Sequence, residues 1–218
     1  MPKRFELLVF DWDGTLMDSA GAIVASIQAS CRDLGLPVPE RERASHVIGL
    51  GLKDALSYAV PELPPGDYGK LAERYRHHYL ARDPDIELFP GMREMLAGLK
   101  QEGYLLAVAT GKSRVGLERV LEATQLKQYF DSSRCADETH SKPHPAMLQE
   151  LMQELLIEAE ATLMIGDTAH DLQMALNAGV PALAVSYGAH PRDSLTGFNP
   201  LACIDTPQAL APWLAKNA

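Results

Sequence analysis

One stretch near the N-terminus decides the fold prediction, and it reads Phe5-Glu6-Leu7-Leu8-Val9-Phe10-Asp11-Trp12-Asp13-Gly14-Thr15-Leu16. The short apolar run up to Phe10 is typical of a buried strand, which ends at Asp11. Asp11 and Asp13 are two positions apart, so an extended chain directs both carboxylates to one side. Gly14 then permits a sharp turn of the backbone. The stretch therefore predicts a buried strand with a pair of carboxylates at its carboxyl end.

The close pair Asp11 and Asp13 has several chemical interpretations. Two carboxylates this near repel each other, which disfavours ionisation of both. A divalent cation relieves the repulsion, and Mg²⁺ prefers oxygen ligands. A nucleophile and a proton-transferring group are a second pair of roles that fits. An Asp-x-Asp-Gly turn also ends strands that have no such chemistry, so the pair alone leaves a structural role open.

Helix-like and strand-like segments alternate from Pro90 towards the C-terminus. We expect strands at 104–109, 162–166 and 181–186, a weaker strand near 130–136, and helices at 91–102, 114–123, 145–157, 171–178 and 207–216. This alternation is typical of a parallel sheet with helices on both faces. The expected fold class is therefore α/β, with a Rossmann-like parallel sheet as its core.

The segment between the first strand and this alternating region has a different pattern. Residues 20–35 have helical spacing, and Asp18 and Ser19 are good N-caps for that helix. Prolines then interrupt a series of helical pieces up to residue 88, and no convincing strand occurs there. We therefore predict two parts: a core of residues 1–15 and 89–218, and an all-helical insert at 16–88.

The composition excludes several classes of protein. The chain has 218 residues, a formal net charge of −9 and 46% hydrophobic residues, which indicates a globular protein and argues against nucleic-acid binding through a broad basic face. Cys31, Cys135 and Cys203 form no Cys-x-x-Cys motif, so neither a zinc site nor a redox motif is indicated, and a reducing compartment is expected. Neither a signal peptide nor a membrane span is recognisable, so we expect a cytoplasmic protein without a membrane partner.

Three further polar clusters follow predicted strands or precede predicted helices: Thr110-Gly111-Lys112-Ser113, Ser141-Lys142-Pro143 and Gly166-Asp167-Thr168-Ala169-His170-Asp171. Ligands of open parallel sheets bind outside the carboxyl ends of the strands, where these clusters should meet Asp11 and Asp13. Each cluster alone also fits an ordinary helix cap or an exposed loop. Their order at successive strand ends predicts a site for an anion together with a hard cation.

With these four clusters the sequence resembles the haloacid dehalogenase superfamily, whose phosphatases use an aspartate nucleophile. Residues 11–15 match its first motif, Asp-x-Asp-Gly-Thr, and residues 166–171 match the fourth, while Thr110 and Lys142 match the second and third. The run Lys142-Pro143-His144-Pro145 is similar to the Lys-Pro-x-Pro of the phosphoglycolate-phosphatase-like branch. The resemblance covers essentially the whole chain, and it implies the superfamily's α/β core with a helical cap inserted after the first motif.

The resemblance also implies a role for each matching residue. Asp11 would be the nucleophile that forms an aspartyl-phosphate, and Asp13 would act as acid and then as base. Thr110 and Lys142 would hold the phosphoryl oxygens. The Mg²⁺ ligands would be Asp11, the main-chain carbonyl of Asp13, and Asp167, with Asp171 as a supporting carboxylate.

Other positions are expected near the substrate. Gly14, Thr15 and Gly111 belong to the motifs, and Gly111 lets the backbone approach a ligand closely. Lys53 lies in the loop 49–53 of the predicted cap, where it would contact a substrate carboxylate or a second phosphate. An exposed lysine in a flexible turn is the alternative for Lys53. The resemblance gives Lys112 no role, and His140 and His170 lack metal-ligand spacing, so structural roles are expected for these histidines.

Together these roles predict Mg²⁺-dependent hydrolysis of a small phosphorylated metabolite, a phosphate monoester, through an aspartyl-phosphate. A sugar-phosphate mutase and an inorganic pyrophosphatase on the same scaffold are alternatives. A phospho-accepting signalling domain also combines carboxylates with Thr and Lys, but it is shorter, has a different acidic pair and lacks a large insert after its first strand. Neither the particular substrate nor the oligomeric state follows from the sequence.

Overall fold

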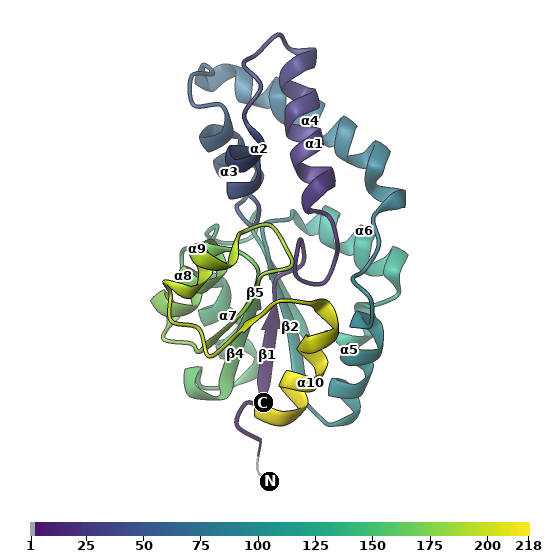
Figure 1. Ribbon diagram of the computed structural model, residues 1–218, viewed down its shortest axis with the longest axis vertical. Coiled ribbons are helices and arrows are strands. Elements are labelled where there is room, and N and C mark those ends of the chain that lie inside the picture. The colour runs from purple at the N-terminus through teal and green to yellow at the C-terminus, as the bar shows by residue number, and fades with distance from the viewer. Residues whose placement is uncertain (1–2) are drawn as a thin grey trace.

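The computed structural model describes residues 3–218 and contains a six-stranded sheet in the order β3-β2-β1-β4-β5-β6 (Figure 1). Neighbouring strands run parallel throughout this sheet. The strands are β1 (Leu7–Phe10), β2 (Leu105–Thr110), β3 (Ser132–Cys135), β4 (Thr162–Gly166), β5 (Ala182–Val185) and β6 (Cys203–Ile204). β1 lies between β2 and β4, and the predicted α/β class is confirmed.

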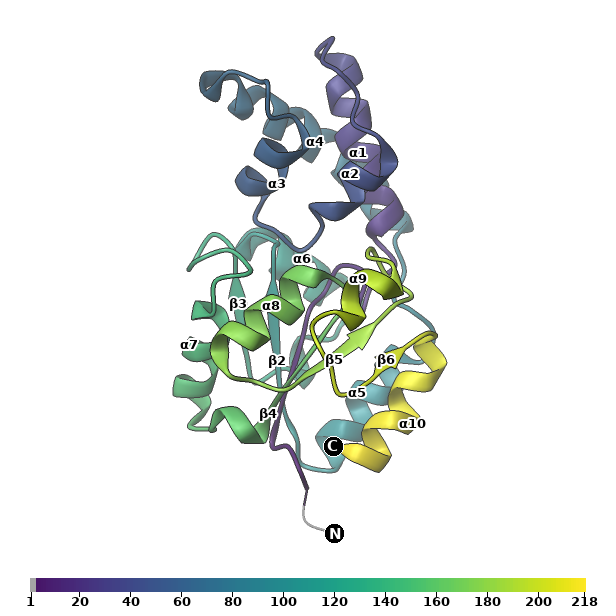
Figure 2. The same ribbon diagram turned by 60° about the vertical axis from the view of Figure 1, so that its left-hand side comes forward.

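Helices cover both faces of the sheet, as Figure 2 shows. They are α5 (Met92–Gln101), α6 (Arg114–Thr124), α7 (Ala146–Leu155), α8 (Ala169–Ala178), α9 (Arg192–Thr196) and α10 (Pro207–Asn217). Leu8 and Phe10 of β1 pack into one hydrophobic cluster with α5, α6 and α10, whereas Leu7 and Val9 pack into another with α7 and α8. Alternate residues of a strand point to opposite faces, so the central strand is buried on both.

The elements expected from the sequence are present, with ends shifted by at most two residues. The helix expected at 171–178 begins at Ala169, because Thr168 caps it in a reciprocal arrangement with Asp171. The sequence pattern does not predict α9 and β6, since five and two residues are too few to show a period.

Four helices between β1 and α5 form a separate layer at one end of the sheet, seen at the top of Figure 1. They are α1 (Ala20–Asp33), α2 (Arg41–His46), α3 (Leu52–Ala59) and α4 (Tyr68–Arg82), with 3₁₀ turns at Pro65–Asp67 and Asp83–Asp85. Their apolar side chains form a hydrophobic cluster of their own, which includes Ile27, Leu56 and Leu71. We call this layer the cap. Among residues 3–218, no helix is long and apolar enough to cross a membrane.

Two linkers join the cap to the core, and they lie side by side. Met17 pairs with Leu88 in an antiparallel bridge, and the N–H of Phe89 donates to the carbonyl of Leu16 over 3.0 Å. The chain therefore enters and leaves the cap at adjacent points. The domain boundaries at residues 16 and 88 stay predictions, and residues 1 and 2 of the predicted core segment 1–15 lie outside the described residues.

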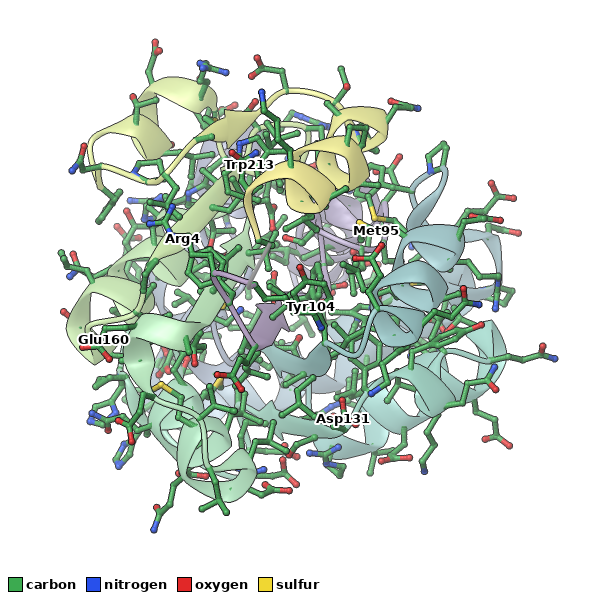
Figure 3. All side chains as sticks on the ribbon, turned by 90° about the horizontal axis from the view of Figure 1, so that it is seen from below. Arg4, Met95, Tyr104, Asp131, Glu160 and Trp213 are labelled. Atoms are coloured by element: carbon green, nitrogen blue, oxygen red, sulfur yellow. The ribbon has the colours of Figure 1, made fainter. Side chains whose placement is uncertain are left out.

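The two ends of the sheet carry different residues. Figure 3 looks onto the end far from the cap, where Arg4, Tyr104 and Glu160 are labelled. These residues precede β1, β2 and β4. The polar clusters at Asp11, Thr110 and Asp167 come at or after the ends of the same strands, so they lie at the opposite end, beneath the cap.

Candidate active site

The predicted site residues gather at the carboxyl ends of three neighbouring strands. Asp11 follows β1, Thr110 ends β2, and Asp167 follows β4. Lys142 comes from the loop before α7. All four side chains are buried, although each is polar or charged. Such groups are stable inside a protein only when they are paired, so their partners define the site.

The ammonium group of Lys142 lies between two carboxylates. Its Nζ is 2.7 Å from Oδ1 of Asp11 and 2.6 Å from Oδ1 of Asp171. Burial lowers the pKa of Lys142, but the charges of Asp11 and Asp171 outweigh burial and raise that pKa above its ordinary value. Lys142 therefore keeps its positive charge at neutral pH, which is the state that binding phosphoryl oxygens requires.

Asp11 is surrounded by more negative charge than Lys142 balances. Its Oδ2 is buried and has no hydrogen-bond partner within residues 3–218. Burial raises the pKa of Asp11 well above its usual range, Lys142 opposes this, and Asp171, Asp167 and Asp13 raise it further. The centre of the site is thus short of positive charge.

Asp167 is held by a hydrogen bond on each oxygen. Its Oδ1 accepts from the hydroxyl of Thr15 at 2.8 Å, and its Oδ2 accepts from the N–H of Ala189 at 2.7 Å. Burial and the charge of Asp171 nevertheless raise the pKa of Asp167 to about 7. Gly14 has a φ of 85°, and a Cβ there would collide with the Asp167 carboxylate. In this structure Gly14 leaves room for the Asp167 carboxylate and Thr15 donates a hydrogen bond to it. The contact of Gly14 and Thr15 with substrate stays a prediction.

The donor atoms fit a hard divalent cation. Asp11, Asp167 and Asp171 each bring a carboxylate oxygen within 4.8 Å of the others. The unpartnered Oδ2 of Asp11 is an oxygen that such a cation would satisfy. Both oxygens of Asp171 have partners already: Lys142 on Oδ1, and the hydroxyl and N–H of Thr168 on Oδ2. These contacts fit a Mg²⁺ site in which Asp11 and Asp167 would be ligands, while Asp171 is already paired with Lys142.

Asp13 has a different set of partners. Its Oδ1 accepts from the hydroxyl of Ser19 at 2.6 Å and lies 2.9 Å from Nζ of Lys112. Ser19 occupies the N-cap position of α1 as expected, but its side chain bonds Asp13 and makes no cap hydrogen bond. Lys112 also donates to the hydroxyl of Tyr79 in α4 at 2.9 Å. Burial lowers the pKa of Lys112, but Asp13 and Tyr79 outweigh burial and raise it.

The cap touches the site through the backbone of its loop 49–51. The N–H of Gly51 donates to the hydroxyl of Ser141 at 2.8 Å. A Cβ at Gly111 would collide with the carbonyl oxygens of Gly49 and Leu50. The group that approaches Gly111 closely is therefore the cap loop. Lys53 is exposed in the first turn of α3, and its contact with substrate stays a prediction.

Three histidines make a further contact between cap and core. The carbonyl of His46, at the end of α2, is 2.7 Å from Nε2 of His170 and 3.1 Å from Nε2 of His190. The N–H of Ala169 donates to Nδ1 of His190, which fixes the proton of the neutral ring on Nε2. Burial lowers the pKa of His190 to about 4. His190 is therefore a neutral donor to the cap, although nitrogens of the three rings lie within 4.8 Å of one another.

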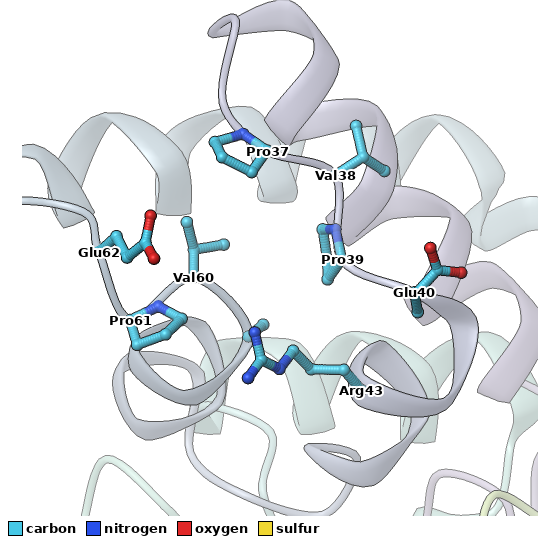
Figure 4. Close-up of a pocket in the computed structure, with 9 residues that line it drawn as sticks. Pro37, Val38, Pro39, Glu40, Arg43, Val60, Pro61 and Glu62 are labelled. Atoms are coloured by element: carbon cyan, nitrogen blue, oxygen red, sulfur yellow. The ribbon is translucent and has the colours of Figure 1, made fainter.

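A pocket of about 270 Å³ lies elsewhere in the cap (Figure 4). Residues 37–40, Arg43 and residues 59–62 line it. None of the site residues expected from the sequence is among them, so this pocket is separate from the reacting groups.

Comparison with known proteins finds a family model and related sequences that match this chain. The family model described as haloacid dehalogenase-like hydrolase matches residues 8–185. The chain is 40% identical over 207 residues to a protein named probable phosphatase IndB from Dickeya dadantii (strain 3937), which covers 92% of this chain and 89% of that protein. It is 32% identical over 217 residues to a phosphoglycolate phosphatase from Agrobacterium fabrum (strain C58 / ATCC 33970). This alignment covers 97% of this chain and 93% of that protein.

The fold has close structural relatives too. The crystal structure of a hydrolase from Pseudomonas syringae superposes with a TM-score of 0.89 at 22% identity, covering 98% of this chain and 99% of that one. At this identity the likeness concerns the fold alone. The family model spans most of the sequence, including all four motifs and the cap. The chain therefore belongs to the haloacid dehalogenase-like hydrolase family.

Proposed function

We propose that the protein is a phosphatase that hydrolyses a small phosphate monoester through an aspartyl-phosphate on Asp11. One observation carries the proposal: Asp11 is buried at the end of the central strand, with one oxygen paired to Lys142 and the other without a partner among the described residues. Membership of a hydrolase family and relatives named phosphatases support the reaction class.

In the first step, an oxygen of Asp11 attacks phosphorus while the bond from phosphorus to the leaving oxygen breaks. Asp13 donates a proton to that oxygen, so that an alcohol leaves. Lys142 and Thr110 bind the phosphoryl oxygens on which negative charge is spread. The product is a phosphoryl group bonded to Asp11.

In the second step, Asp13 accepts a proton from water as the water oxygen attacks phosphorus. The bond between phosphorus and the Asp11 oxygen breaks, inorganic phosphate leaves, and both aspartates return to their starting states. The cap loop on Ser141 and Gly111 keeps bulk water away from the intermediate.

The metal would be held by Asp11, the main-chain carbonyl of Asp13 and Asp167, with Asp171 in support. When bound, Mg²⁺ supplies the positive charge that lets a phosphate dianion approach this group of carboxylates. Burial and the neighbouring carboxylates raise the pKa values of Asp11 and Asp167, which supports this need for a cation.

A phosphate-release screen tests the proposal. It uses a panel of phosphate monoesters, among them phosphoglycolate and sugar phosphates, together with pyrophosphate, each with Mg²⁺ and after chelation. We expect Mg²⁺-dependent release from at least one monoester, and loss of that release in Asp11→Asn. Release from pyrophosphate alone, isomerisation of a sugar phosphate without release, or equal release by Asp11→Asn would each contradict the proposal.

A further inference from the structure

Lys112 has no role in the two proposed chemical steps, although its charge is enclosed at the site. Its side chain is only 9% exposed. It follows Thr110 and Gly111 at the end of β2, and its own N–H is 3.2 Å from the hydroxyl of Thr110. An ammonium group withdrawn from water is costly unless it is paired. The two partners of Lys112 come from different parts of the molecule.

The first partner is Asp13, from the core. Its Oδ1 is 2.9 Å from Nζ of Lys112 and also accepts from Ser19 at 2.6 Å. Two donors on one oxygen fix the orientation of the carboxylate and leave Oδ2 for proton transfer. A general acid must lie within hydrogen-bond reach of the atom that it protonates, and a small displacement lowers the rate strongly.

The second partner is Tyr79, from helix α4 of the cap. Its hydroxyl is 2.9 Å from Nζ of Lys112, and the centre of its ring is 4.9 Å from the same nitrogen. Both the hydroxyl oxygen and the ring face attract a cation. The cap also rests on Ser141 and Gly111 in this structure, so Lys112 has its full set of partners with the cap seated.

We propose that Lys112 is a positioning residue that holds Asp13 in the orientation its proton transfers need, and that Tyr79 completes this arrangement when the cap is seated. The inference rests on the proposed function, since it concerns the same reaction. It couples the two chemical steps to cap closure, because Asp13 is fully oriented only beneath the closed cap.

A rival role for Lys112 is direct binding of an anionic group on the substrate. The contacts favour positioning, because Asp13 and Tyr79 already occupy two of the three N–H donors of Lys112. The two roles also differ kinetically. Loss of a positioning residue lowers kcat for every substrate, whereas loss of a binding residue raises KM for substrates that carry the anion.

The experiment compares Lys112→Met and Tyr79→Phe with two matched controls in the full-length protein. Lys216→Met removes an exposed lysine charge in α10. Tyr68→Phe removes a cap hydroxyl that donates to the carbonyl of Val60 at 2.8 Å, from the same helix as Tyr79 but about three turns away. Each protein is assayed with nitrophenyl phosphate and with an alkyl phosphate that has an uncharged leaving group. Rapid quench separates the first turnover from the steady rate.

We expect Lys112→Met to lower kcat about 10- to 100-fold for both substrates, with KM changed by less than about threefold. The first turnover should slow more with the alkyl phosphate, because its leaving oxygen depends on Asp13 for a proton. Tyr79→Phe should lower kcat about three- to tenfold in the same manner. Lys112→Arg, which keeps a charge and N–H donors, should recover part of the loss. Lys216→Met and Tyr68→Phe should match the wild type.

An unchanged kcat in Lys112→Met, or a raised KM with unchanged kcat, would overturn the positioning role. Equal kcat values for Tyr79→Phe and Tyr68→Phe would overturn the link to the cap. Circular dichroism checks that each variant is folded. If Lys112→Met does not fold, the kcat of Tyr79→Phe tests the proposal instead, because this variant lacks only a hydroxyl. Failure of the wild type to release phosphate from any monoester would contradict the proposed function itself, so the two failures are distinguishable.

Discussion

The core side and the cap side of the site differ in the chemical groups that they contribute. On the core side, charged side chains are fixed by ion pairs and hydrogen bonds at the ends of strands, as Lys142 is between Asp11 and Asp171. On the cap side, the backbone meets the core through the carbonyl of His46 and the loop 49–51, and the uncharged hydroxyls of Ser45 and Tyr79 add hydrogen bonds. In the proposed reaction, the reacting groups therefore belong to the core, while the cap lies over the site. Substitutions in the two regions should have different kinetic signatures.

The largest effect should come from the core nucleophile. Asp11→Asn should lower kcat by at least about 10³-fold, because an amide is a poor nucleophile for phosphorus. The fold should survive, since Lys142 keeps its partner Asp171. Phosphate release and circular dichroism measure both outcomes, with Asp54→Asn, an exposed carboxylate in the cap, as the matched control. Activity well above background in pure, folded Asp11→Asn would contradict the assignment of Asp11 as the nucleophile.

A second core substitution separates the two steps. Asp13→Asn removes both protonation of the leaving group and activation of water, so steady turnover should fall by about 10² or more. Nitrophenolate leaves without much protonation, so the variant should release a burst of nitrophenol and then stall with phosphate on Asp11. An alkyl phosphate should give almost no burst.

Rapid quench with both substrates measures this difference. If burst and steady rate slow equally for nitrophenyl and alkyl phosphates, Asp13 is not the proton-transferring group. It would then act only through its position beside Ser19 and the proposed metal site.

A smaller effect is expected where core and cap meet. Gly111→Ala places a methyl group against the carbonyls of Gly49 and Leu50, so the cap loop must shift. We expect kcat/KM to fall about tenfold from displacement of the closed cap. The control is Gly98→Ala in α5, where a Cβ meets nothing within 4 Å and the change should stabilise the helix by about 0.5–1 kcal/mol. Equal activity of the two variants would show that cap seating does not limit the reaction.

The smallest effect should come from the exposed cap lysine. Lys53→Met should leave kcat unchanged and raise KM by no more than about threefold, and only for substrates with a second negative charge, because an exposed charge interacts weakly. Initial rates with charged and uncharged leaving groups measure this. A large fall in kcat would show that Lys53 takes part in the chemical steps, which would contradict the assignment of the reacting groups to the core alone.

The same contrast explains what could be predicted from the sequence. Asp11, Thr110 and Asp167 could be predicted as site residues because each ends or follows an apolar strand, and the carboxyl ends of parallel strands meet at one edge. Lys142 was found in a polar cluster before a predicted helix, the family resemblance gave it a role, and the family itself is confirmed. The chemical roles of these residues stay predictions for the experiments above.

Other contacts left no trace in the sequence. Tyr79 meets Lys112 across 33 positions, and His190 meets His46 across 144, so no local period links them. Ser19 matched a helix cap, but in the structure its hydroxyl turns to Asp13. Such pairs depend on how the cap sits on the core, which is a tertiary arrangement rather than a local propensity.

The adjacent linkers of the cap have a consequence for how this architecture can vary. The N–H of Phe89 donates to the carbonyl of Leu16, so 72 intervening residues leave the sheet and return to almost the same point. The cap also has its own hydrophobic cluster. Lengthening a loop between two fixed, neighbouring ends costs little entropy, because that cost grows only logarithmically with length. A different insert could therefore replace this one without disturbing strand register, while the proposed phosphoryl-transfer centre stays the same.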